Sequence, residues 1–321
     1  MEKMMISETA CRATELDVMA AKVAESAARL PQIEEGTPEQ ARAFRAERGN
    51  PFAPAPCELH SIIDLNIPIR RGSVNARQYV PTADSVGRGC FVYFHGGGFV
   101  LSTVNDYDTV TQRLAMHSGR TVISIDYERA PENKIKSIHQ DGYDAWCWIA
   151  EHGEELGIDS SRLAVGGDSA GGNLTVAVTL ACKRNGAPMP VQQVLIYPSV
   201  DPTMKFPSIQ EFASGYLLTR PGMDWFRSHY LESPEQVKDP ELQFLKQDLS
   251  GLPSAILITA GFDPLRDEGQ AYADRLQQFG VSVTHWCYTD MIHAFLSFAG
   301  GIAAGEDAIR RIGTSLKQVL A

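Results

Sequence analysis

The 321-residue sequence lacks the patterns that mark metal or redox sites built from cysteine. It contains no Cys-x-x-Cys pair, and its six cysteines are scattered, so their spacing does not indicate such a site. Several of them lie in apolar runs. We therefore expect buried free thiols in a reducing cytoplasm. The six are Cys11, Cys57, Cys90, Cys147, Cys182 and Cys287.

Long hydrophobic runs and clusters of basic residues are absent as well. Charged residues interrupt the first 30 positions, which leaves no apolar core for a signal peptide, and no later run is long enough to span a bilayer. The net charge is −10, without a Lys/Arg cluster. This balance disfavours nucleic acid and anionic membrane surfaces as partners, so we expect a cytoplasmic protein that binds neither.

Internal repeats and low-complexity tracts are also missing, and short apolar runs alternate with helical segments instead. Residues 63–69 and 74–80 alternate with a period of two and predict a hairpin. The later runs are continuously apolar, as in strands buried on both faces of a parallel sheet. The alternation predicts the α/β class, with an eight-stranded, mostly parallel sheet flanked by helices. The other expected strands are 90–94, 121–126, 163–166, 193–197, 255–259 and 281–288, and the expected helices are 107–117, 138–152, 173–184, 267–279 and 306–320.

Two regions do not fit this alternation. The N-terminal region carries an apolar helical stripe from Leu16 to Leu30, and Thr37-Pro38 then starts a second helix. The region 199–249 is too long for a simple crossover and holds a helical piece near 221–231. We therefore predict cap helices over 1–50, a cap insertion over 199–249, and one catalytic domain formed by 51–198 and 250–321.

The stretch Gly167-Asp-Ser-Ala-Gly171 fits the pattern Gly-x-Ser-x-Gly between an expected strand and an expected helix. In a nucleophile elbow, flanking glycines avoid steric clashes in a tight turn and the helix start stabilises negative charge beside the serine. A glycine-rich turn with an incidental serine is the simpler alternative. A phosphate-binding loop does not fit the spacing. We take Ser169 as the candidate nucleophile.

A serine nucleophile needs a base, and the base needs an orienting acid. His293 follows the last expected strand, at the edge where the serine emerges, whereas His285 lies inside that strand and His229 lies in the predicted cap. For the acid, Asp263 follows the seventh expected strand. Asp267, which suits a helix start, and Asp201, after the sixth strand, remain alternatives.

Three consecutive glycines follow the third expected strand, in His95-Gly-Gly-Gly-Phe99. Glycines let backbone N–H groups approach a ligand closely, and this loop donates to the oxyanion in such folds together with the residue after the nucleophile. The candidate donors are Gly97, Gly98 and Ala170. A merely flexible loop is the alternative.

These blocks together resemble the hormone-sensitive-lipase-like family of α/β-hydrolase esterases. The resemblance implies an α/β-hydrolase fold with a helical cap, nucleophile Ser169, acid Asp263 and base His293, and no metal or organic cofactor. It also implies that Gly97, Gly98 and Ala170 are the oxyanion donors and that His95 helps to hold their loop. The matching blocks are 95–99, 126–132, 167–172, 263–269 and 293–295.

The chain departs from the family pattern in two places beside the oxyanion loop. Glu128-Arg129 stands where the family usually has Arg-Leu, and Asn133-Lys-Ile-Lys136 replaces a proline-containing stretch. Neither departure touches the triad. Both are expected to affect substrate preference or the stability of the loop.

We accordingly predict a carboxylesterase for small-molecule esters with short to medium acyl chains. Phe99, Tyr216 and Leu217 are candidate pocket residues. An acyltransferase or amidase using the same triad remains open, and so does a non-catalytic small-molecule receptor, although such receptors lack the base that His293 supplies here. A homodimer through the last strand, an expected sheet edge, is also possible.

Overall fold

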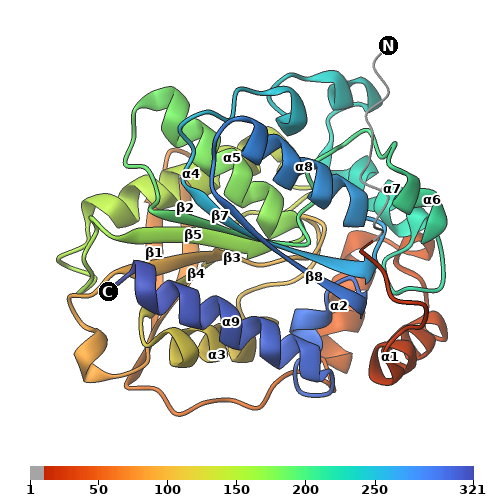
Figure 1. The fold of residues 1–321 in the computed structure, drawn as a ribbon, viewed down its shortest axis with the longest axis horizontal. Helices are drawn as coiled ribbons and strands as arrows, with labels where there is room; N and C mark the ends of the chain where they lie inside the picture. Colours follow the sequence, from red (N-terminus) through yellow and green to blue (C-terminus); the bar gives the residue numbers. More distant parts are fainter. Residues whose placement is uncertain (1–10) are drawn as a thin grey trace.

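A computed structural model describes residues 11–321, so the first ten residues of the predicted N-terminal cap lie outside the described part. Its centre is one eight-stranded sheet in the order β1-β2-β4-β3-β5-β6-β7-β8 (Figure 1). The β1–β2 and β2–β4 pairs are antiparallel and the other pairs are parallel, which confirms the predicted sheet. The strands are β1 (Ser61–Ile69), β2 (Gly72–Val80), β3 (Cys90–Phe94), β4 (Thr121–Asp126), β5 (Leu163–Asp168), β6 (Gln192–Ile196), β7 (Ser254–Phe262) and β8 (Val283–Ile292).

Helices cover both faces of the sheet (Figure 1). On one face α3 (Asp108–Ser118) packs against α9 (Ala303–Val319), and on the other lie α4 (Ile135–Glu151), α5 (Ala170–Asn185) and α8 (Arg266–Gln278). Every residue of β3, β5 and β6 is buried, which is why these strands read as continuous apolar runs. The core therefore forms two layers, one on each side of the sheet.

The helix boundaries differ from expectation by a few residues. The helix α5 begins at Ala170, three residues before the expected 173, because it follows β5 across a single residue. It ends at Asn185, one residue beyond the expected end, and Gly186 after it takes the left-handed conformation with φ 65°. The short 3₁₀ turns are η1 (Ile33–Glu35), η2 (Ala83–Ser85), η3 (Pro234–Lys238), η4 (Phe244–Lys246) and η5 (Phe295–Phe298).

Both predicted cap segments contain helices within the described residues. They contain α1 (Val18–Ala28), α2 (Pro38–Arg48), α6 (Pro207–Glu211) and α7 (Arg220–Tyr230), which lie at one end of the sheet (Figure 1). Thr37 caps α2 as expected, by accepting a hydrogen bond from the Gln40 N–H. The indole of Trp225 in α7 donates to the Gly36 carbonyl at 3.2 Å, so the two segments touch. Their division from a catalytic domain stays a prediction.

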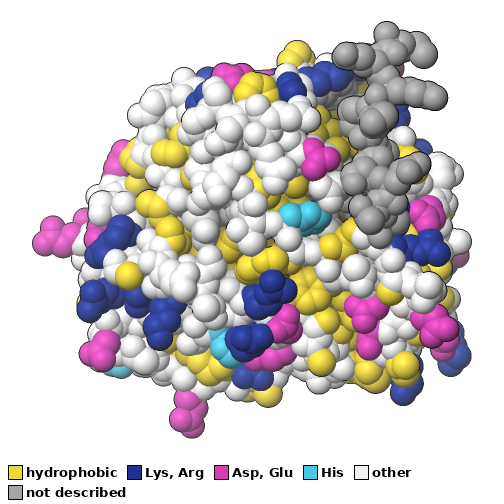
Figure 2. Space-filling view, viewed as in Figure 1, with side chains coloured by type: hydrophobic (Ala, Val, Ile, Leu, Met, Phe, Trp, Pro, Cys, Tyr) yellow, Lys and Arg dark blue, Asp and Glu magenta, His cyan; other side chains and the backbone are white. Residues whose placement is uncertain are grey.

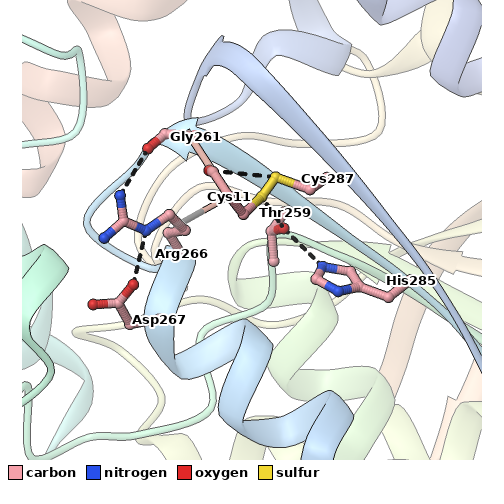
Figure 3. The surroundings of a disulfide bond; sticks show 7 residues. All are labelled: Cys11, Thr259, Gly261, Arg266, Asp267, His285 and Cys287. Atoms are coloured by element: carbon pink, nitrogen blue, oxygen red, sulfur yellow. Dashed lines mark hydrogen bonds and ion pairs between the residues drawn. A yellow bond between two sulfur atoms is a disulfide. The ribbon is translucent and has the colours of Figure 1, made fainter. Parts of the chain in front are cut away.

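The expectation of six free thiols is wrong for one pair. Cys11 and Cys287 form a disulfide beside Thr259 and His285 (Figure 3). Their Cα atoms are 6.0 Å apart, which suits a disulfide, but 276 positions separate them in the sequence and no spacing rule links them. This pair removes the argument from free thiols for a reducing compartment. Cys57, Cys90, Cys147 and Cys182 are free; Cys90 and Cys182 are buried as expected, whereas Cys57 and Cys147 are only partly buried.

The segment that carries Cys11 runs along β8, the last strand of the sheet. The Ala13 N–H donates to the Thr289 carbonyl at 2.8 Å, and the Asp17 N–H donates to the Asp290 carbonyl at 3.0 Å. Part of the predicted free edge is therefore occupied by the chain itself. Pairing of β8 with a second copy stays a prediction.

The surface carries acidic and basic side chains with apolar ones between them on the face drawn in Figure 2. Within residues 11–321, no helix combines the length and the apolar character needed to cross a membrane.

Candidate active site

Ser169 is the single residue between β5 and α5. Its backbone has φ 55° and ψ −116°, a conformation that residues with a side chain seldom adopt. The flanking glycines explain how the turn closes. A Cβ on Gly167 or Gly171 would run into the carbonyl of Phe94 on the neighbouring β3. Only glycine at these two positions lets the turn lie against the sheet and present the serine at its edge.

Three side chains from three strand ends form one hydrogen-bonded line. The His293 Nε2 atom lies 2.9 Å from Ser169 Oγ, and its Nδ1 atom lies 2.7 Å from Asp263 Oδ2. Asp263 follows β7 and is fully buried, and His293 follows β8. A carboxylate only accepts hydrogen bonds, so the Nδ1 atom carries the proton and the Nε2 atom can accept from the serine hydroxyl. The imidazole is thus held in the tautomer that a general base requires.

The alternative acids bond elsewhere. The Asp201 carboxylate accepts from the backbone and hydroxyl of Thr203, at 3.0 and 2.7 Å. The Asp267 carboxylate accepts from Arg266 Nε at 2.7 Å and from the Ser208 N–H at 2.9 Å. His285, weighed as a base, bonds to Thr259 at 2.8 Å. The line through Ser169 thus contains the acid and base that the sequence favoured.

The predicted oxyanion donors Gly97, Gly98 and Ala170 line one cavity together with Ser169 and His293. Each of these donors belongs to a peptide unit whose carbonyl also accepts a hydrogen bond. Because a peptide unit is planar, holding its carbonyl also sets the direction of its N–H. The bonds are His95 Nδ1 to Gly96 O at 2.8 Å, Val100 N and Leu101 N to Gly97 O at 3.1 and 2.8 Å, and Asn173 N and Ser199 N to Ser169 O at 3.1 and 3.2 Å.

His95 is fully buried beneath this loop. Its ring stacks between those of Tyr107 and Tyr127, with centroids 5.6 and 4.5 Å away. Its carbonyl accepts from the Tyr127 hydroxyl at 2.7 Å. Since the Gly96 carbonyl can only accept, the Nδ1 atom of His95 is the protonated nitrogen. These contacts are consistent with the role that the resemblance implies for His95, which is to hold the glycine loop.

Asp168 is a buried residue of the site that the sequence analysis did not single out. Its carboxylate accepts from the hydroxyls of Tyr93 and Tyr107 at 2.7 and 2.8 Å, and from the Gly96 N–H at 2.7 Å. Burial raises the pKa of Asp168, while the two phenols act in the opposite direction. It ties the turn at Ser169 to the glycine loop. Its place inside the Gly-x-Ser-x-Gly pattern was the available signal.

The cavity has a volume of about 860 Å³, within the range of small-molecule sites. Of the predicted pocket residues, Phe99 and Leu217 line it. Tyr216 does not, because its ring packs on Phe212 and Phe262, with centroids 5.2 and 5.5 Å away. Other apolar residues that line the cavity include Leu218, Met223, Phe226 and Tyr230.

The two departures from the family pattern both take part in holding the site. The Arg129 guanidinium donates to the Ser102 carbonyl at 3.1 Å, just beyond the glycine loop. Lys134 donates to the His229 carbonyl in α7 at 2.6 Å. Both side chains thus support loop and cap backbone. Among residues 11–321, no cluster of three or more His, Cys, Asp or Glu side chains suits a metal ion.

Comparison with known proteins gives a consistent result. A family model described as the alpha/beta hydrolase fold matches residues 91–297. The carboxylic ester hydrolase LipN of Mycobacterium tuberculosis is 38% identical over 263 residues, which cover 78% of this chain and 70% of that protein. An ethyl acetate hydrolase of Pseudomonas putida is 36% identical, covering 82% of this chain and 84% of its own length.

A solved structure shares the whole architecture. The ester hydrolase EH1AB1 from the metagenome of Lake Arreo superposes with a TM-score of 0.90 at 33% sequence identity, covering 94% of this chain and 98% of its own. Family match, relatives and architecture agree with the motifs at 95–99, 167–172 and 293–295. The chain therefore belongs to the hormone-sensitive-lipase-like esterases of the α/β-hydrolase family.

Proposed function

We propose that this ester hydrolase is a carboxylesterase in which Ser169 is the nucleophile, His293 the general base and Asp263 its orienting acid. The observation that carries the proposal is the line of two hydrogen bonds, of 2.9 and 2.7 Å, that joins these side chains. The N–H groups of Gly97, Gly98 and Ala170 are the oxyanion donors, and His95 supports their loop. Of the predicted cap segments 1–50 and 199–249, the described residues 11–50 and 199–249 form the cap over the cavity.

The reaction proceeds through an acyl-enzyme. The Ser169 oxygen attacks the ester carbonyl while His293 Nε2 takes its proton, and the tetrahedral oxyanion is held by the three N–H groups. The C–O bond to the alcohol breaks as the imidazolium returns the proton to the leaving oxygen. A water molecule then repeats the sequence on the acyl-enzyme and releases the acid. Asp263 stabilises the imidazolium in both halves.

The substrate class is an ester with a short to medium acyl chain. Each methylene adds about 0.8 kcal/mol of binding while it still finds apolar wall. A cavity of about 860 Å³ must hold both acyl and alcohol parts, so the gain ends at a finite length. The similarity to an ethyl acetate hydrolase favours small esters. Specificity should peak at roughly two to eight acyl carbons and decline for long chains.

The test is a series of p-nitrophenyl esters of increasing acyl length, measured with the wild type, Ser169→Ala and His293→Ala. Loss of either triad member should lower kcat by roughly 10⁴- to 10⁶-fold. Asp263→Asn should cost somewhat less. A folded His293→Ala variant that turns over at the wild-type rate would refute the assignment.

Asp267→Asn and Asp201→Asn are the matched controls for the acid. Their carboxylates bond to Arg266 and Thr203 rather than to the histidine, so most of the activity should remain. If either control lost more activity than Asp263→Asn, that aspartate would be the acid instead of Asp263. Amide substrates and added alcohols in the same assay separate an esterase from an amidase or acyltransferase.

A further inference from the structure

One arginine of the cap helix α2 reaches the loop that follows β3. Arg42 Nε donates to the Val100 carbonyl at 2.8 Å, and its Nη2 donates to the Ala130 carbonyl at 2.6 Å. Both Nη atoms also bind the Glu132 carboxylate, at 2.6 and 2.9 Å. A guanidinium presents its donors in a rigid planar fork, so the carboxylate sets the direction of Nε. The ion pair lowers the pKa of Glu132 to about 2, which keeps both partners charged at neutral pH.

The contact with Val100 continues as a chain of peptide groups. The Val100 carbonyl and the Leu101 N–H are the two ends of one peptide unit, and that N–H donates to the Gly97 carbonyl at 2.8 Å. The Gly97 carbonyl and the Gly98 N–H are in turn the ends of the next unit. Arg42 therefore stands at the head of a hydrogen-bonded chain that finishes at one of the proposed oxyanion donors.

A second, neutral chain arrives at the same carbonyl. The Ala130 N–H donates to the Phe99 carbonyl at 2.8 Å, and the Val100 N–H, at the other end of that peptide unit, donates to the Gly97 carbonyl at 3.1 Å. Ala130 is also the residue whose own carbonyl Arg42 binds. Both chains of hydrogen bonds that end at the Gly97 carbonyl thus depend on the position of the Arg42 side chain.

We infer that Arg42 is a positioning residue for the oxyanion site: it orients the Gly98 N–H through the Val100 and Gly97 peptide units and strengthens it as a donor. Charged donors form stronger hydrogen bonds, and successive bonds in a chain polarise one another by about 10–30% each. The inference rests on the proposed function. Its consequence is that the cap contributes to turnover as well as to substrate binding, because a stronger oxyanion donor acts chiefly in the transition state.

The experiment compares Arg42→Met and Arg42→Lys with the wild type on a soluble short-chain p-nitrophenyl ester. Complete loss of an oxyanion donor costs roughly 100- to 1,000-fold in kcat, so weakening one should cost roughly 5- to 50-fold. KM should change by less than about threefold, because the ground-state ester gains little from the oxyanion donor. Arg42→Lys keeps the charge but loses the fork and should fall between the other two.

Inhibition by an alkylboronic acid distinguishes a positioning role from a purely structural one, because a purely structural role of Arg42 would leave the inhibition constant unchanged. Its tetrahedral adduct with Ser169 places an oxygen at the proposed oxyanion site, so its inhibition constant should rise in step with the loss of kcat/KM. Arg220→Met is the matched control, because that cap arginine pairs within α7 with Asp224 at 2.8 Å. It should leave kcat and boronic acid affinity within about twofold of wild type.

Two outcomes overturn the inference. One is a folded Arg42→Met variant with kcat no lower than that of Arg220→Met. The other is a loss of activity carried by KM alone with unchanged boronic acid affinity. If Arg42→Met does not fold, Arg42→Lys and restoration of kcat in Arg42→Ala by added guanidinium decide the question. If one of the two overturning outcomes is found while Ser169→Ala is inactive, only the role of Arg42 is refuted. If Ser169→Ala is active, the proposed function itself is refuted.

Discussion

The turn at Ser169 and the glycine loop after β3 line the same cavity, yet they are held in different ways. The turn is closed by steric fit, because Gly167 and Gly171 lie against the Phe94 carbonyl of the neighbouring strand. Most groups that hold the glycine loop come from distant parts of the chain. Those distant groups are Arg42, Tyr127, Arg129, Ala130 and Asp168.

This difference has a physical consequence for mutations. A steric contact with backbone cannot relax without moving a strand, so a change in the turn should act as a threshold. A loop held by several hydrogen bonds, each contributing about 1 kcal/mol, should weaken by degrees. Under the proposed function, the turn therefore sets whether the nucleophile is presented at all, and the loop sets how well the transition state is stabilised.

The largest expected effect is the loss of stability when a methyl group is added to a glycine of either region. The two regions differ in the atoms that this methyl group meets. In Gly171→Ala the Cβ meets the Phe94 backbone, and we expect a loss of about 3 kcal/mol in unfolding free energy. In Gly98→Ala the Cβ meets the ring of Phe226, at a backbone φ of +61°. Adding Phe226→Ala should recover part of the unfolding free energy lost in Gly98→Ala and none of that lost in Gly171→Ala. Urea unfolding of the four variants measures this.

The double variants show which contact limits each glycine position. Full recovery of Gly171→Ala by Phe226→Ala would contradict a backbone contact at the turn. Absence of any recovery in Gly98→Ala would mean that the left-handed backbone conformation, rather than the ring, limits the loop.

A smaller effect is expected at Asp168, which touches both regions. Tyr107 is the sole described donor to the Asp168 Oδ2 atom, whereas the Oδ1 atom accepts from both Tyr93 and Gly96. Tyr107→Phe should therefore leave a buried carboxylate oxygen without a partner and cost about 1–3 kcal/mol. Tyr93→Phe, the matched control, should cost less. Thermal unfolding of the two variants ranks them, and the reverse order would show that the Oδ1 side carries the link.

The last expected effect appears only below neutral pH and concerns His139, which lies between the two regions. Its Nε2 atom is 2.8 Å from Asn173 Oδ1 in α5, and its ring forms a T-shaped pair with that of Phe99, with centroids 6.3 Å apart. Burial lowers the pKa of His139 to about 4. The unfolded chain, with a histidine pKa near about 6.5, then binds more protons than the folded one between these values. The contribution to stability is present above about pH 6.5 and is lost as the pH falls towards about 4.

His139→Gln keeps a hydrogen-bonding group at this place but does not titrate. Its free energy of unfolding should therefore vary less with pH than that of the wild type across the window from about 4 to about 6.5. Urea unfolding at several pH values, taken as the difference between the two proteins, isolates this residue from the carboxylates. Parallel curves would contradict a neutral, half-buried imidazole.

The sequence allowed most of the architecture to be predicted, because apolar runs and glycine positions respond to local constraints. The strands from β3 to β7 were predicted within a few residues, since strands buried on both faces are mostly apolar. The candidate nucleophile, acid and base could also be chosen by their order after strand ends. Parallel strands bring those ends to one edge of a sheet, whatever the intervening sequence.

Other features depended on which distant side chains meet, and local pattern carries no record of that. The disulfide between Cys11 and Cys287 joins positions 276 apart, so the expectation of free thiols was wrong there. The helical pattern near 221–231 predicted α7 but not that its Phe226 faces the cavity while Tyr216 packs away from it. Periodicity predicts that a helix has an apolar face, not which surface that face meets.

The sequence by itself determined most of the elements, the elbow and the chemistry that we propose for Ser169, Asp263 and His293, because these follow from residue type, spacing and strand order. The tertiary structure alone decided the support of the glycine loop by Arg42 and Asp168. Their donors and acceptors are complete only when a cap helix and a strand end are packed beside the loop. Hydrogen bonds between distant segments depend on the relative placement of whole elements, which no local pattern specifies.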